Sequence, residues 1–325
     1  MVKVRPLFLF SLPRSGSTLL QRILGAHHSI ATTSEPWILL PLIYTLREKG
    51  IYTEYRHATA MIAIEDFYNE MPKGVADYLA EIRSFVLNLY SKVSKDNSIY
   101  FLDKTPRYHL IVEDIIQLFP EGKFIFLWRN PLSIVASLIN SFGKGRWDLF
   151  HYQVDLYDGL ANLISISRKY QPQICQIRFE ALIKDPLHEL EQILSYLDLP
   201  LESKMLNEFN NVDLKGHEGD RIGSKEYNHI SFEPLDKWKF VLSNHIRKRW
   251  CKHYLKWIGS ERLGFMGYDL DNLISDLNSI TFSINYLPSD VALMIFGLGY
   301  RFFEPRIFKH KLLTLPDWHN IHSHT

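Results

Sequence analysis

Apolar residues recur along this chain in two alternating patterns. Short uninterrupted apolar runs predict buried strands, and longer segments with apolar residues three or four positions apart predict helices. The predicted strands cover residues 7–11, 99–102, 123–128 and 174–177. The predicted helices cover residues 17–25, 75–93, 110–116, 131–142 and 154–166. Because strands alternate with helices, we expect an α/β fold with a P-loop-type parallel sheet flanked by helices and joined by right-handed crossovers.

Charged and aromatic residues follow the ends of these predicted strands. Arg14, Lys104, Arg129 and Phe179 each lie just after one of them. In an open parallel sheet, ligands bind in the crevice beyond the carboxyl ends of the strands. The sequence therefore predicts that one crevice collects these four residues.

The loop between the first predicted strand and the first predicted helix has the composition of an anion site. A helix start leaves backbone N–H groups without partners and carries a partial positive charge, so an anion binds there readily. Gly16 lets the backbone approach a ligand closely. A cation and three hydroxyl residues surround it: Arg14, Ser15, Ser17 and Thr18. We expect an anionic cofactor here, the alternative being an ordinary turn between strand and helix.

The same loop departs from that of nucleotide triphosphatases. Their pattern requires a Lys before the Ser or Thr, to reach the terminal phosphates beside magnesium. Ser17 takes the place of that Lys, Ser11 replaces the first Gly, and the cation Arg14 precedes the turn. The loop therefore favours a group other than a magnesium-bound γ-phosphate, and no metal is expected.

Two motifs resemble those of the sulfotransferases that use 3′-phosphoadenosine-5′-phosphosulfate (PAPS). Pro-Arg-Ser-Gly-Ser-Thr-Leu-Leu, at 13–20, resembles their 5′-phosphosulfate loop. The strand at 123–128, followed by Arg129-Asn130-Pro131 and by Ser137 eight residues beyond the Arg, is similar to their 3′-phosphate motif. In style these motifs are closest to those of protein-tyrosine and bacterial sulfotransferases. The resemblance covers residues 6–255 and implies transfer of a sulfuryl group from PAPS to a hydroxyl or an amine.

The resemblance implies further cofactor contacts. Phe179 holds the place of an aromatic residue that lies by the adenine in relatives, although a Phe of the core is an equal alternative. A loop at 219–225, ahead of Trp238, would approach the 3′-phosphate with Arg221, Ser224 or Lys225. We take residues 1–265 as the sulfotransferase domain and residues 266–325 as a mainly helical C-terminal extension of unknown role.

The resemblance also implies catalytic roles. Glu35 lies in a segment similar to the one that carries the base of protein-tyrosine sulfotransferases, the alternative being that it opens a helix at Pro36. Lys104 matches a family Lys that donates to the sulfuryl oxygens, and Arg14 would serve the leaving oxygen. Cytosolic small-molecule sulfotransferases use a His two residues after that Lys, where this chain has Pro106. The fallback bases are His27 and His109.

Composition narrows the function classes. The chain has 325 residues, 46% of them hydrophobic, and a net charge of +1, which argues against a nucleic-acid binder. The basic triplet at 247–249 is expected on a solvated helix face. Two cysteines are too few for a disulfide framework, and Cys175 is expected in the core. Because no apolar leader precedes the first strand, the expected location is cytoplasmic.

Several alternatives stay open. The aromatic segment 36–71 suits a small-molecule, sugar, lipid or peptide hydroxyl acceptor equally well. The apolar run 291–300, followed by basic residues, is too short to span a bilayer. It could contact a membrane surface, act as a lid, form a homodimer or pack on the core. The rival functions are a non-catalytic nucleotide-binding or membrane-associated module, and a metal-dependent kinase with Asp103 at its magnesium site.

Overall fold

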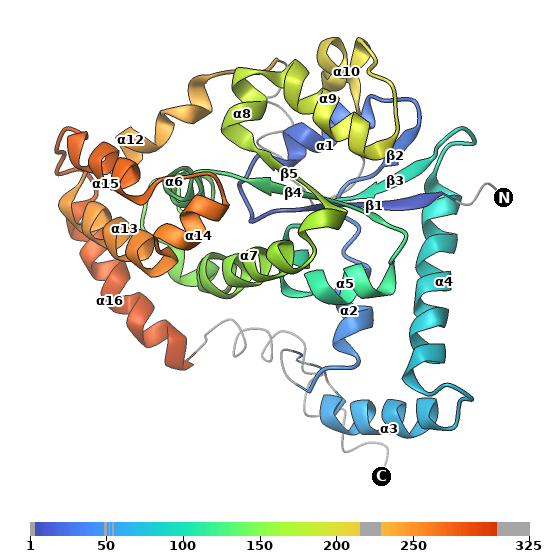
Figure 1. Cartoon of the computed structure of the whole chain (residues 1–325). Coiled ribbons are helices and arrows are strands. Elements are labelled where there is room, and N and C mark those ends of the chain that lie inside the picture. Colours follow the sequence, from blue (N-terminus) through green and yellow to red (C-terminus); the bar gives the residue numbers. More distant parts are fainter. Residues whose placement is uncertain (1–3, 49–50, 52, 54, 215–228, 304–325) are drawn as a thin grey trace, which may run out of the picture.

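A five-stranded parallel sheet forms the centre of the molecule (Figure 1). The computed structural model describes residues 4–48, 51, 53, 55–214 and 229–303. The strands are β1 (Arg5–Phe10), β2 (Ile30–Thr32), β3 (Tyr100–Asp103), β4 (Lys123–Trp128) and β5 (Ile174–Arg178). Their order across the sheet is β2-β3-β1-β4-β5, and every neighbouring pair is parallel. The predicted α/β fold is confirmed.

Helices cover both faces of the sheet. The longer ones are α1 (Ser17–Gly25), α2 (Leu39–Tyr44), α3 (His57–Asn69), α4 (Val75–Val93), α5 (Val112–Leu118), α6 (Pro131–Ser141), α7 (Leu160–Lys169), α8 (Phe179–Lys184), α9 (Pro186–Leu197), α10 (Lys204–Asn207), α12 (Lys237–Val241), α13 (His245–Ile258), α14 (Ser260–Phe265), α15 (Leu270–Ser279) and α16 (Leu287–Phe303). Short helical turns are η1 (Pro106–Leu110), η2 (Leu149–Tyr152), η3 (Asp155–Gly159), η4 (Gln171–Gln173), η5 (Phe209–Asn211) and η6 (Glu233–Leu235). Among the described helices, none is long and apolar enough to cross a membrane.

Alternation along the central strands creates two hydrophobic cores. Leu7 and Leu9 of β1 lie in one cluster with buried residues of α1, α8 and α9. Phe8 and Phe10 lie in the other, with buried residues of α4, α5, α6 and α7. This follows from the two-residue period of a strand, which sends successive side chains to opposite faces. Because both faces are covered, the strands read as continuous apolar runs, as parallel strands usually do.

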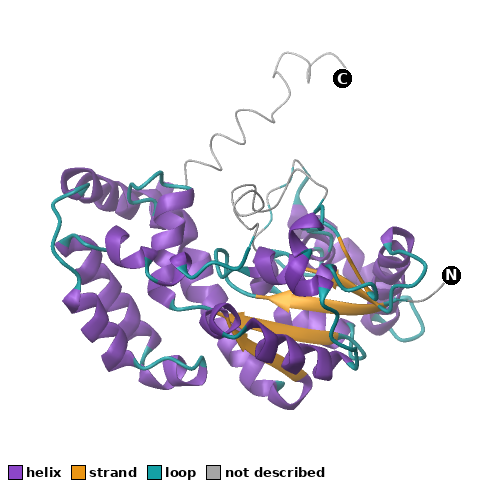
Figure 2. Cartoon of the chain, turned by 90° about the horizontal axis from the view of Figure 1, so that it is seen from above, coloured by secondary structure: helices purple, strands orange, loops and turns teal. Residues whose placement is uncertain are grey.

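The C-terminal helices gather on one side of the sheet (Figures 1 and 2). Leu273 and Leu277 of α15 belong to the same hydrophobic cluster as Phe8 and Phe10. The helical character predicted for this region is confirmed as far as residue 303. The boundary at residue 265 stays a prediction.

A buried ion pair attaches α16 to α13. Arg247 is only 2% exposed and donates from Nε and Nη2 to the two carboxylate oxygens of Asp290, at 2.7 and 2.9 Å. Asn244, which caps α13, also donates to Asp290 at 2.7 Å. The prediction of a solvated face is therefore wrong for Arg247. The helical spacing of the triplet could not reveal an acidic partner 43 residues away.

Replacing Asp290 should destabilise the protein strongly. Asp290→Ala leaves the Arg247 guanidinium buried without its carboxylate, which typically costs about 3–5 kcal/mol of unfolding free energy. Urea unfolding checks this value. The control is Asp276→Ala, which removes an exposed carboxylate from α15 and should change stability by less than about 0.5 kcal/mol. Equal losses in the two variants would contradict the structural role of the pair.

Candidate active site

The loop between β1 and α1 holds two residues in the left-handed conformation. Arg14 has a φ of 67° and Gly16 a φ of 88°. A Cβ at Gly16 would lie 2.2 Å from Cε2 of Phe179. Gly is therefore required here both for its backbone conformation and for space. The close packing fixes the loop directly in front of the first turn of α1.

An unsatisfied hydroxyl marks this loop as a binding site. Ser15 is 1% exposed, and its Oγ has no hydrogen-bond partner within the described part of the chain. Buried polar atoms are nearly always hydrogen-bonded in native structures, so an orphan needs an explanation. An anion bound at the start of α1 would accept a hydrogen bond from this hydroxyl. The donor set of the loop fits a phosphate or phosphosulfate group.

The two cofactor motifs meet in space. Nε of Arg14 donates to Oγ of Ser137 in α6 at 3.1 Å. Nη1 of Arg129, at the end of β4, donates to the backbone oxygen of Arg14 at 2.8 Å, and its Nη2 donates to Pro234 O at 3.2 Å. Residues more than a hundred positions apart are thereby joined beyond the carboxyl ends of β1 and β4, and the single crevice that would also hold Lys104 stays a prediction.

The ring of Phe179 packs against both the loop of Gly16 and the side chain of Arg129. This ring is fully buried and lies 4.4 Å from the Arg129 guanidinium. A cation over an aromatic face is a favourable contact. The described contacts therefore place Phe179 in the core, which was one of the two alternatives for this residue. Its contact with an adenine stays a prediction. Arg221, Ser224 and Lys225 lie outside the described residues.

Glu180 is a residue whose role the sequence did not reveal. Its Oε1 accepts from the backbone N–H of Asn130 at 2.9 Å, and its Oε2 accepts from the Tyr268 hydroxyl at 2.6 Å. Burial, with the Glu180 carboxylate nearby, holds the pKa of Tyr268 well above its usual range. Glu180 therefore ties the Arg129 loop both to α8 and to the C-terminal helices.

Glu35 and Lys104 form an ion pair at the ends of neighbouring strands. Nζ of Lys104 lies 2.7 Å from Oε1 of Glu35, and the two side chains are 2% and 9% exposed, respectively. Trp37 Nε1 donates to Oε2 of Glu35 at 3.1 Å. The alternative that Glu35 opens a helix at Pro36 is wrong, because α2 begins only at Leu39. The sequence-predicted base and cation thus lie in direct contact.

A buried carboxyl positions the segment that carries Glu35. Asp103 Oδ2 accepts from the hydroxyls of Tyr90, at 2.6 Å, and Tyr108, at 3.0 Å. Its Oδ1 accepts from Thr105 Oγ1 at 3.1 Å. The same Thr105 and Tyr108 oxygens accept from the backbone N–H groups of residues 37 and 39, both at 3.3 Å. The network joins the end of β3 to the residues that follow Glu35.

Asp103 is also the residue that the kinase alternative would place at its magnesium site. Asp103 is fully buried, and burial raises the pKa of its carboxyl to about 6, against the opposing effect of its three hydroxyl donors and of Lys104. Burial and Asp103 itself raise the pKa values of Tyr90 and Tyr108 well above their usual range. Asp103 is fully buried and accepts hydrogen bonds from three side-chain hydroxyls, an environment typical of a structural carboxyl rather than of an accessible magnesium ligand.

The fallback bases lie in buried sites of their own. His109 is fully buried, with Nε2 2.7 Å from Asp155 Oδ1. His27 is 1% exposed, and burial lowers its pKa. Its Nδ1 accepts from the backbone N–H of Ser29, and its Nε2 lies 3.0 Å from Pro200 O. Neither imidazole has a described contact with Glu35 or Lys104, and the assignment of the base stays a prediction.

One group of side chains has the composition of a metal site. Its potential ligand atoms, from His27, His28 and Glu202, lie within 4.8 Å of one another. A metal at His27 Nε2 requires that nitrogen to be unprotonated. Because His27 Nδ1 accepts a backbone N–H, the neutral ring carries its proton on Nε2, where it donates to Pro200 O. The ring therefore does not offer a free lone pair to a cation at this position.

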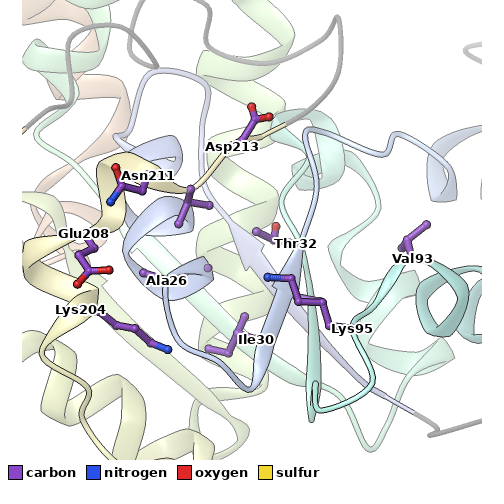
Figure 3. A pocket seen from close by; sticks show the side chains of 12 residues that line it. Ala26, Ile30, Thr32, Val93, Lys95, Lys204, Glu208, Asn211 and Asp213 are labelled. Atoms are coloured by element: carbon purple, nitrogen blue, oxygen red, sulfur yellow. The ribbon is translucent and has the colours of Figure 1, made fainter.

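A cavity of about 480 Å³ lies beside the edge strand β2 (Figure 3). Its walls come from the end of α1, the end of α4 and the segment around η5, with Lys95, Lys204, Glu208 and Asp213 among the lining residues. These residues carry both signs of charge. The cavity meets α1 at Gly25, whereas the phosphate loop precedes Ser17, so the two sites lie at opposite ends of that helix.

The comparisons with known proteins agree with this geometry. The model of the sulfotransferase family matches residues 6–203. The chain belongs to the sulfotransferase family. It is 34% identical over 137 residues to the nodulation protein NoeE of Sinorhizobium fredii, a match that covers 42% of this chain and 31% of that protein. It is 24% identical to a protein-tyrosine sulfotransferase of Drosophila melanogaster, covering 71% of this chain and 46% of that protein.

Two solved sulfotransferase domains share the fold. The domain from the Synechococcus PCC 7002 olefin synthase has a TM-score of 0.52 at 21% identity, covering 73% of this chain and 88% of that one. The domain from the curacin biosynthetic pathway has a TM-score of 0.50 at 24% identity, covering 73% of this chain and 91% of that one. The chain spans less than half the length of NoeE and of the Drosophila protein.

The Asp103 network of this sulfotransferase generates a pH-dependent prediction. The pKa of this carboxyl is 3.8 in the unfolded chain, and burial raises it to about 6 in the folded protein. The folded state therefore binds the proton more tightly, and this group lowers the unfolding free energy as the pH rises between these values. From pH 4.5 to pH 7 the loss amounts to about 2 kcal/mol.

Asp103→Asn removes this titration. Urea unfolding at the two pH values should show that the wild-type protein loses about 2 kcal/mol more than the variant over this interval. Parallel changes in the two proteins would contradict the raised pKa. The comparison is between two pH dependences, so it is insensitive to any uniform destabilisation that the amide causes.

Proposed function

We propose that the protein transfers the sulfuryl group of PAPS to a hydroxyl acceptor, with Glu35 as the base and with Lys104 and Arg14 stabilising the transferred and leaving groups. The observation that supports it most directly is the ion pair between Glu35 and Lys104 at the ends of β2 and β3. The loop between β1 and α1 lies one strand away, because β1 is the other neighbour of β3. The proposed base, cation and anion site thus all follow the carboxyl ends of neighbouring strands, β2, β3 and β1.

The cofactor-binding side of the proposal rests on the joined motifs. The N–H groups at the start of α1, the Ser15 hydroxyl, Ser17 and Thr18 would hold the 5′-phosphosulfate, and Arg129 with Ser137 would hold the 3′-phosphate. When bound, PAPS supplies the sulfuryl group and, as its leaving group, 3′-phosphoadenosine 5′-phosphate. The contact of Arg14 with Ser137 supports the proposal, because it would keep the two phosphate sites at a fixed separation.

The chemical step needs a proton acceptor and two cations. As the new bond between the acceptor oxygen and sulfur forms, the bond from sulfur to the phosphate oxygen breaks, and the hydroxyl proton passes to Glu35. Lys104 balances charge on the sulfuryl oxygens and Arg14 balances it on the leaving oxygen. A carboxylate has about four acceptor positions, so Glu35 can take an acceptor hydroxyl while it keeps Lys104 and Trp37.

The proposed partner is a small-molecule, sugar, lipid or peptide hydroxyl, and no nucleic acid is proposed. The names of the relatives cover more than one setting, since one is a nodulation protein and another acts on protein tyrosine. A non-catalytic nucleotide-binding module is the second candidate. It would keep the phosphate loop, but it would give no function to the buried pair of Glu35 and Lys104.

Glu35→Gln tests the proposal. The amide cannot accept the proton, so transfer of labelled sulfate from PAPS should fall by about 10²–10⁴-fold, while affinity for 3′-phosphoadenosine 5′-phosphate stays within about twofold. The acceptor panel is a tyrosine peptide, a phenol, an oligosaccharide and a hydroxylated lipid. Glu65→Gln, which changes an exposed carboxylate of α3, is the matched control and should transfer normally.

Two outcomes would count against the assignment. Normal turnover by Glu35→Gln would exclude Glu35 as the base. Tight binding of the nucleotide by the wild-type protein, without transfer to any acceptor of the panel, would favour the binding module. Matched activity of the Glu65→Gln control separates loss of the base from a general effect of removing a carboxylate.

A further inference from the structure

Helix α16 exposes apolar side chains on the face that points away from the protein. Its inward side carries the buried residues Asp290 and Gly297, and a Cβ at Gly297 would lie 3.0 Å from Phe150. On the outward side Val291, Ile295 and Leu298 are 41%, 65% and 73% exposed. Their spacing of four and three residues places them in one stripe. A surface helix normally carries polar residues there.

The segment that leads into α16 continues this apolar surface. Phe282, Ile284 and Tyr286 are exposed, by 47%, 70% and 50%. Ile284 and Tyr286 lie in the non-helical segment directly before Leu287, where α16 begins. We call the six exposed side chains of this segment and of the helix the C-terminal apolar surface: Phe282, Ile284, Tyr286, Val291, Ile295 and Leu298. Large exposed apolar surfaces of this kind mark sites of association.

Positive charge predominates around this surface, and the acidic residue next to its loop cations, Asp148, is paired with His151. Between residues 280 and 303 the sequence contains a single acidic residue, Asp290, and its carboxylate is buried against Arg247. Lys144 and Arg146 are exposed on the loop that packs beside Tyr286, where a Cβ at Gly145 would lie 3.0 Å from the Tyr286 hydroxyl. From residue 301 onward the sequence adds Lys and Arg residues at 301, 306, 309 and 311, against acidic residues at 304 and 317.

We propose that α16 docks on an anionic lipid surface. The helix would lie in the plane of the interface with its outward stripe at the boundary between headgroups and acyl chains. Lys144 and Arg146 would face the headgroups, where each cation typically contributes about 1 kcal/mol. Over its described residues the helix is not long and apolar enough to span the bilayer, so we infer a peripheral and reversible association.

The charge pattern favours a lipid surface over a second copy of the chain. A symmetric dimer through this surface would bring the same residues of both copies together, including Lys144 and Arg146. The cations of both copies would then be enclosed in one interface, to which the segment 280–303 contributes no exposed acidic partner. An anionic membrane complements the cations and covers the apolar stripe at the same time. Docking requires no sulfuryl transfer, so it can be tested independently.

Co-sedimentation of the full chain with vesicles tests the proposal. The wild-type protein should pellet with vesicles of phosphatidylcholine mixed with phosphatidylglycerol, and more weakly with phosphatidylcholine alone. The double variant Ile295→Glu with Leu298→Glu should bind the mixed vesicles at least about tenfold more weakly, because two apolar side chains no longer insert. The double variant Lys144→Ala with Arg146→Ala should bind the mixed vesicles about tenfold more weakly, and its binding should depend less on salt.

The matched control is Leu187→Glu with Leu201→Glu. These residues are also exposed, by 46% and 40%, but they lie at the start of α9 and just after it, on the other face of the sheet. This variant should bind vesicles as the wild type does. Circular dichroism verifies that each variant is folded.

Two results would overturn the proposal. One is equal vesicle binding by the wild type and by the Ile295/Leu298 variant, or no binding by the wild type to either vesicle. The other is a wild-type dimer in light scattering that becomes a monomer in that variant without vesicle binding, which would identify a second copy as the occupant.

Discussion

The contact of Arg14 with Arg129 and Ser137 organises the candidate active site. Arg14 adopts a left-handed backbone, which costs an ordinary residue about 1–2 kcal/mol, and such a conformation persists only where neighbours hold it. Arg129 holds the Arg14 carbonyl, and Ser137 holds its side chain. Since β1 and β4 are adjacent strands, the sheet brings these residues together without any flexible connection. The positions of the loop, of α6 and of the Arg129 segment therefore depend on one another.

The same edge of the sheet also carries the pair that we propose for the chemistry. Removing Lys104 and Glu35 from water is costly unless the charges are paired, and each supplies the partner of the other. Asp103 precedes Lys104 in the chain, but its carboxylate accepts hydrogen bonds from three side-chain hydroxyls, whereas Lys104 pairs with Glu35. The end of β3 thus provides Asp103 as an anchor for the segment after Glu35 and, at the next residue, Lys104 as a cation for the candidate site.

The sequence predicts the parts of the structure that local patterns determine. β1 and β4 are apolar runs because they are buried on both faces, and the position expected for the site follows from the parallel order of the strands. β2 has three residues, so its pattern is too short to detect. The partners of Asp103 could not be foreseen either, because Tyr90 reads as one more apolar position of the α4 stripe. Arg247 shows the same limit, since only the tertiary fold brings Asp290 to it.

Calorimetric titration of the wild-type protein tests the central claim most directly. The ligands are 3′-phosphoadenosine 5′-phosphate, 5′-AMP, and ATP with magnesium, the first two in the presence of a chelator. The account predicts micromolar binding of the bisphosphate without metal, and at least about tenfold weaker binding of AMP because the contacts of Arg129 to the 3′-phosphate are lost. Equal affinity for AMP, or a preference for ATP with magnesium, would contradict it.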